Sequence, residues 1–134
     1  MLLAARSILL AAALFIAAPP VQADPRADYL LHCSGCHMPD GSGLSPVVPT
    51  LHDVPGRMLA IPQGRSYIVR VPGVAQAPIN DRKLTDVLNW ILTEFSSATL
   101  PKDFEPLTVQ EVSRARSQLL ADPLEFRRSY WPDY

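Results

Sequence analysis

The chain has 134 residues, two cysteines, three histidines and a formal net charge of −1 at pH 7. This length suits one small domain, and the balanced charge excludes the strongly basic surface that nucleic acid or an anionic membrane would attract. Two cysteines exclude a disulfide framework, and neither a nucleophile–base pair nor a carboxylate dyad indicates a hydrolase.

Residues 1–23 have the composition of a secretory signal peptide. Arg6 precedes an apolar run from Ile8 to Ala18, and small residues lead up to Ala23. The apolar run is shorter than the roughly 20 residues that span a bilayer. We therefore expect cleavage after Ala23, a mature chain without a stable membrane span, and a periplasmic location.

The first helix of the mature chain is expected to begin at Asp24. Asp followed by Pro25 is typical of a helix N-cap and first helical residue. Tyr29 lies four residues before Cys33, on the same helical face. The helix should therefore lead directly into the motif that begins at Cys33.

That motif is Cys33-Ser34-Gly35-Cys36-His37, the C-x-x-C-H spacing of c-type haem attachment. Two thiols on one helical turn can each add to a haem vinyl group, and the next histidine can bind the iron as proximal ligand. We predict one covalently attached haem c, with Cys33 and Cys36 as anchors and His37 as metal ligand.

Three other interpretations of the motif are weaker. A thioredoxin-like pair needs a βαβ context, and a zinc site needs further ligands that His32 and His52 do not supply as a second pair. A structural disulfide between Cys33 and Cys36 would leave His37 without a role.

The segment after the motif begins with turn residues from Met38 to Gly43. Ser66–Val71 is a short element that contains β-branched residues. The sequence therefore does not decide whether it is a helix or a strand. A longer helix is expected to start near Asn80, where Leu84, Leu88, Ile91 and Phe95 form one apolar stripe. Trp90 of this helix should pack near Tyr29.

Two further helical signals follow in the last third of the chain. Thr108-x-x-Glu111 resembles a capping box, and Asp122-Pro123 can start one more turn. The chain ends in Phe126, Tyr130, Trp131 and Tyr134, an aromatic group that we expect to dock on its own domain.

Between about residues 25 and 96 the chain resembles a small class I c-type cytochrome. Besides the haem motif, Pro49 stands twelve residues after His37, and Leu51-His52-x-x-x-Gly56-Arg57 is similar to a family segment. The resemblance implies that the Pro49 carbonyl accepts a hydrogen bond from the His37 ring and that Arg57 contacts a haem propionate.

The resemblance implies an all-α fold of cytochrome c-like helices around one haem. Residues 24–97 would be the haem domain. Residues 98–134 have no counterpart in the minimal family fold, so we expect a C-terminal extension that is helical and docked on the domain.

The chain departs from the family at the distal ligand. The family's methionine loop corresponds here to residues 71–78, which contain no Met, His or Lys. Met38 lies on the wrong side of the haem, which leaves Met58. Either Met58 closes a His/Met site, or the distal position is vacant or weakly filled, with Val74, Ala75 and Gln76 over the iron and Gln76 near a ligand.

The leading function is electron transfer between redox partners, a dehydrogenase or an oxidase, rather than enzymatic catalysis. An open distal site would instead bind a small ligand, as in a gas sensor or a slow peroxidase. A third alternative is a haem subunit of a larger dehydrogenase, on which the tail from Leu100 to Tyr134 would dock.

Overall fold

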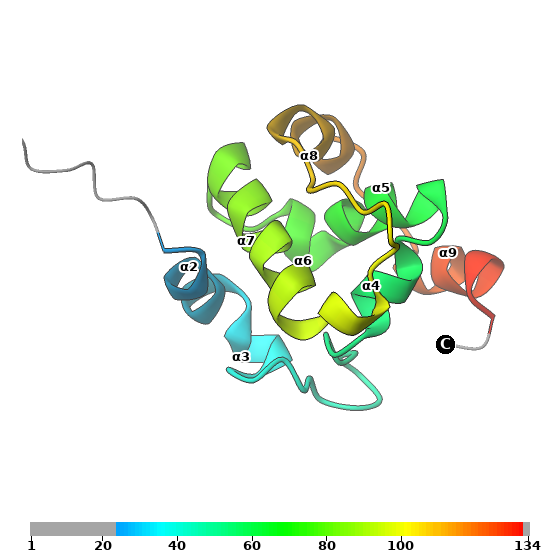
Figure 1. The fold of residues 1–134 in the computed structure, drawn as a ribbon, viewed down its shortest axis with the longest axis horizontal. Helices are drawn as coiled ribbons and strands as arrows, with labels where there is room; N and C mark the ends of the chain where they lie inside the picture. Colours follow the sequence, from blue (N-terminus) through cyan, green and yellow to red (C-terminus); the bar gives the residue numbers. More distant parts are fainter. Residues whose placement is uncertain (1–23, 133–134) are drawn as a thin grey trace, which may run out of the picture.

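The predicted all-α fold is confirmed. The structure, a computed structural model, describes residues 24–132, and within that range β pairing is limited to one isolated bridge between Leu44 and Val48. None of the described helices is long and apolar enough to cross a membrane. The helical elements are α2 (Pro25–His32), α3 (Ser34–His37), α4 (Val54–Met58), α5 (Pro62–Arg70), α6 (Pro72–Ala75), α7 (Asp81–Phe95), η2 (Ser97–Thr99), α8 (Val109–Arg116) and α9 (Pro123–Tyr130) (Figure 1).

The ends of the helices follow local capping chemistry. The side chains of Asp24, Asn80, Thr108 and Asp122 each accept a hydrogen bond from a backbone N–H in the first turn of their helix. Thr108 also forms the predicted capping box with Glu111. The predicted helix starts are therefore confirmed.

Helix α2, at the start of the described chain, lies against α7 (Figure 1). Tyr29 is completely buried between them, with its ring centroid 5.1 Å from that of Trp90 and 5.4 Å from that of Phe95. The half-exposed Lys83 forms an ion pair with the buried carboxylate of Asp28 at 3.0 Å. The expected contact between Trp90 and Tyr29 is confirmed.

The element that the sequence left open between helix and strand is a helix. Helix α5 covers most of Ser66–Val71 and begins earlier, at Pro62, which fits the first turn of a helix. It buries Tyr67, Ile68 and Val69. Tertiary packing outweighs the β preference of branched residues here, because these side chains join the main hydrophobic cluster.

The C-terminal extension packs into that same cluster. Leu107, Val112, Leu120 and Trp131 are all buried in it together with residues of α5 and α7. Asn89 of α7 donates to the carbonyl of Leu107 at 3.0 Å and accepts from its N–H at 2.8 Å. The described part of the extension is thus helical and docked, while its boundary at residue 97 stays a prediction.

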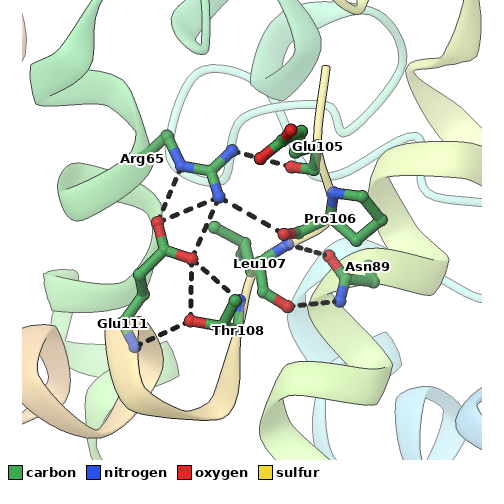
Figure 2. A network of polar contacts seen from close by, with 7 residues as sticks. All are labelled: Arg65, Asn89, Glu105, Pro106, Leu107, Thr108 and Glu111. Carbon is green, nitrogen blue, oxygen red and sulfur yellow. Dashed lines mark hydrogen bonds and ion pairs between the residues drawn. The ribbon is translucent and has the colours of Figure 1, made fainter. Parts of the chain in front are cut away.

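An arginine of α5 ties the extension to the rest of the fold. Figure 2 shows the guanidinium of Arg65 with both carboxylate oxygens of Glu111, at 3.0 and 3.1 Å, and with the carbonyl of Glu105 at 2.8 Å. Burial alone would raise the pKa of Glu111, but hydrogen bonds from Thr108 and Arg65 hold it below its usual value. The carboxylate therefore stays charged at neutral pH.

Some of the aromatic residues near the end of the chain pack against the domain, and one of them is exposed. Phe126 stacks on Tyr67 with ring centroids 5.6 Å apart, and Trp131 is buried, while Tyr130 is 42% exposed. Tyr134 and the predicted signal peptide, residues 1–23, lie outside the described residues.

Candidate haem site

An apolar cavity of about 350 Å³ lies inside the helical fold. It is within the size range of small-molecule sites in proteins. Its lining includes residues of two hydrophobic clusters. The first holds Tyr29, Leu51, Val87 and Ile91, and the second is built around α5 and the extension. We call the part of the lining that carries the haem motif the His37 wall, and the part that comes from α4, α5, α6 and α9 the opposite wall.

The His37 wall carries the three residues of the haem motif. Cys33 ends α2, Cys36 and His37 belong to the one-turn helix α3, and all three line the cavity. Both cysteines are free thiols. Burial, with the nearby charge of Asp28, raises the pKa of the Cys33 thiol to about 11.

The surroundings of the His37 ring determine which of its two nitrogens carries the hydrogen. Its Nδ1 lies 3.1 Å from the carbonyl oxygen of Pro49. That oxygen can only accept, so Nδ1 carries the hydrogen and Nε2 keeps a lone pair. Burial lowers the pKa of His37 below its usual 6.5, although the bond to Pro49 raises it in part. The ring is therefore neutral at pH 7, the form that binds a metal.

The backbone around Gly43 positions the Pro49 carbonyl. Gly43 has φ +72° and donates its N–H to the carbonyl of His37 at 3.0 Å. A Cβ atom on Gly43 would lie only 2.6 Å from the Pro49 carbonyl oxygen. Glycine is needed here for its left-handed conformation and because the two backbones approach closely.

The hydroxyl group of Tyr29 supports the same wall. Burial is the main cause that raises the pKa of Tyr29 to about 12, so the hydroxyl stays protonated. It donates to the carbonyl of Met38 at 2.6 Å. Met38, the residue after His37, has φ +63°, and this bond holds the chain where it turns away from α3.

The opposite wall contains Met58 and Tyr67. Met58, on α4, is only 3% exposed and lines the cavity. Helix α5 comes so close to α4 that a Cβ atom on Gly64 would overlap the Met58 carbonyl. Burial raises the pKa of the Tyr67 hydroxyl, and the charge of Arg127 lowers it in part.

The extension completes the opposite wall. Pro123, Leu124 and Arg127 of α9 line the cavity, about 60 residues beyond Tyr67 in the chain. Sequence reasoning missed both Tyr67 and Arg127. The buried face of α5 could have indicated Tyr67, whereas no local pattern distinguishes Arg127 from a surface arginine.

Two residues considered at the sequence level lie elsewhere. Arg57 is exposed and is not among the residues that line the cavity, so its contact with a propionate stays a prediction. Gln76 is also exposed and outside the lining, while its neighbours Val74 and Ala77 are part of it.

The residues present fit a haem c. Two thiols and a neutral imidazole line an apolar cavity, and apolar side chains of α4, α5 and α7 make up much of the rest of its lining. Haem c needs this donor set: two cysteines for its vinyl groups, an imidazole for its iron and apolar surfaces for its ring faces.

Comparison with known proteins agrees with this site. No protein-family model matches the sequence. The chain is 31% identical to a cytochrome c-552 of Thermus thermophilus in an alignment of 117 residues, and the match covers 74% of this chain and 88% of the relative. It is equally similar to a second cytochrome c-552 of the same species, of which the match covers 78%. Identity at this level over most of the relative's length places the chain in a family: it belongs to the small c-type cytochromes.

Proposed function

We propose that this protein is a periplasmic monohaem cytochrome that carries single electrons between redox partners. The observation that carries the proposal is the placement of Cys33, Cys36 and the neutral ring of His37 on one wall of an apolar cavity. Haem c, when bound there, supplies a one-electron iron couple.

The residues of the His37 wall would attach and orient the group. Cys33 and Cys36 would form the two thioethers, and His37 would present Nε2 as the proximal ligand. Pro49 would fix the tautomer and the ring orientation, because its carbonyl already accepts from Nδ1 at 3.1 Å. The apolar walls would exclude water, which tunes the potential of the iron.

Met58 is our proposal for the second ligand. It is buried and lines the cavity, whereas the neighbouring Arg57 points to solvent. Met58 also belongs to the second hydrophobic cluster, whereas Cys33 packs against the first. A thioether and an imidazole as the two iron ligands would raise the potential, which suits simple electron transfer.

The proposed location rests on the sequence of residues 1–23, and the partners follow from the function. A carrier needs an electron donor and an acceptor, for which we propose an exported dehydrogenase and an oxidase. The burial of Leu107, Val112 and Leu120 against this chain's own core favours a free carrier over a subunit whose tail docks on an enzyme.

The test is the absorption spectrum of the purified ferric protein, after mass spectrometry has established one covalent haem. The parent should show the far-red band of methionine bound to iron. Met58→Leu, which keeps the side-chain volume, should abolish the band, while the matched control Met38→Leu should retain it.

The other outcomes separate the alternatives. A parent without the band, whose ferrous spectrum changes on adding carbon monoxide, would contradict Met58 ligation and favour small-ligand binding. A parent without covalent haem would contradict the proposed function altogether.

A further inference from the structure

The loop between α5 and α7 forms part of the opposite wall and has little structure of its own. It consists of the one-turn helix α6 and a few turn residues, among which Val74 and Ala77 line the cavity. None of residues 71–78 has a side chain that would bind iron strongly. A metal bond from this loop therefore does not hold it in place.

Arg116 of α8 holds the loop instead. Its Nε donates to the carbonyl of Ala75 at 2.7 Å, one Nη donates to the carbonyl of Ile79 at 2.8 Å, and the other Nη donates to the carbonyl of Ala77. Three backbone carbonyls within five residues thus converge on one guanidinium. A planar group with five N–H donors is suited to such a task, and lysine cannot replace it.

An acidic residue orients this guanidinium. Asp81, the first residue of α7, lies 2.9 Å from the same Nη that donates to Ile79. Hydrogen bonds from Ser113 and Arg116 hold the pKa of Asp81 below its usual value. The Arg116 side chain is only 20% exposed, so solvent weakens these contacts less than on an open surface.

We propose that Arg116 is a positioning residue of the haem site. It holds the loop from Ala75 to Ile79 against the cavity and so limits the access of small exogenous ligands to the iron from the side opposite His37. This inference rests on the proposed haem function. It assigns to the extension a role in the site that the haem motif does not predict.

The first test is hydrogen exchange of the haem-loaded protein. The N–H groups of Gln76, Ala77 and Ile79 all make hydrogen bonds inside the loop. In Arg116→Lys their exchange should be at least about tenfold faster, because charge-assisted hydrogen bonds are lost. The α2 amides should not change. The matched control Arg114→Lys alters an exposed arginine of the same helix and should leave the loop unchanged.

The second test is the rate at which imidazole binds to the ferric protein. We expect Arg116→Lys to raise that rate about tenfold over the parent and over Arg114→Lys, in line with the loop opening. Unchanged exchange in the loop would overturn the inference. Faster exchange in the loop with an unchanged rate of imidazole binding would overturn the proposed role of Arg116 in limiting access to the iron.

A third variant covers the case in which Arg116→Lys does not fold. Asp81→Asn removes the ion pair and keeps the three carbonyl acceptors, so loop exchange should rise about threefold. If only this variant can be measured, exchange equal to that of the parent would overturn the inference. Haem content is measured first in every sample, so that a parent without haem counts against the proposed function and not against the role of Arg116.

Discussion

The two walls of the cavity are built in different ways. The His37 wall comes mainly from residues close together in the chain, from His32 to Leu51, with Val87 and Ile91 of α7 beside them. The opposite wall combines α4, α5 and α6 with α9, which follows more than 50 residues after α5. In the proposed function, the first wall would attach the haem, and the second would limit what reaches its other face.

The difference also concerns how each wall is held. Contacts between residues close in the chain hold the His37 wall, such as the close approach of Gly43 to the Pro49 backbone and the hydrogen bond from the Tyr29 hydroxyl to the Met38 carbonyl. Side chains from distant segments hold the opposite wall, with Arg65 and Arg116 as its long-range polar contacts. Three substitutions, in addition to those at Met58 and Arg116, test this comparison.

The largest loss of stability is expected from Leu107→Ala, because Leu107 lies in the core that supports the opposite wall. Leu107 is 3% exposed, and truncating a buried leucine costs about 2–5 kcal/mol of unfolding free energy. Urea unfolding measures this loss. Leu119→Ala, at a leucine that is 47% exposed, should change stability by no more than about 0.5 kcal/mol. Equal effects at the two positions would show that the extension is not part of the core.

An intermediate effect is expected from Gly43→Ala in the His37 wall. The new methyl group meets the Pro49 carbonyl and the residue keeps a positive φ, so we expect a loss of about 1–3 kcal/mol. The shifted carbonyl should also weaken its bond to His37 and so lower the pKa of His37 further, which NMR titration of the haem-free protein detects. Gly35→Ala, where a Cβ meets nothing within 4 Å, is the control. An unchanged His37 titration in Gly43→Ala would contradict this account of the wall.

The smallest effect is expected from Glu111→Gln, and it depends on pH. The pKa of Glu111 is lowered in the folded state, so its contribution is present above the unfolded value of 4.5 and is lost as pH falls through the folded value. The Arg65–Glu111 pair is partly exposed, so we expect at most about 1 kcal/mol at pH 7.

Urea unfolding of parent and Glu111→Gln over this acidic range measures the effect. The two stabilities should converge as the pH falls below 4.5, because the parent alone loses the contribution of the carboxylate. A stability difference that grows toward acid would contradict the assigned direction of the pKa shift.

The sequence predicts the parts of this molecule that depend on local chemistry. The four capping residues and the haem motif are recognisable because each acts within one helical turn. The contact between Tyr29 and Trp90 follows from the resemblance and the helical stripe.

The opposite wall is predictable only in part. Ile68 and Val69 have no local preference that decides between helix and strand, and packing against distant residues decides it. Tyr67 and Arg127 meet at the cavity only because α9 folds back on α5, as the stacking of Phe126 on Tyr67 shows. Arg57 is exposed and outside the lining, so the contact with a propionate that its motif position implies stays a prediction.

The shared core of α5, α7 and the extension has a consequence for biosynthesis. A chain is made from its N-terminus, so residues 24–95 emerge while Leu107, Val112 and Trp131 are still to be added. Residues 24–95 contain the His37 wall, but the apolar faces of α5 and α7 stay uncovered until the extension has been added. Native folding is thus a late event, and a chain truncated before Leu107 would carry an unfinished hydrophobic surface.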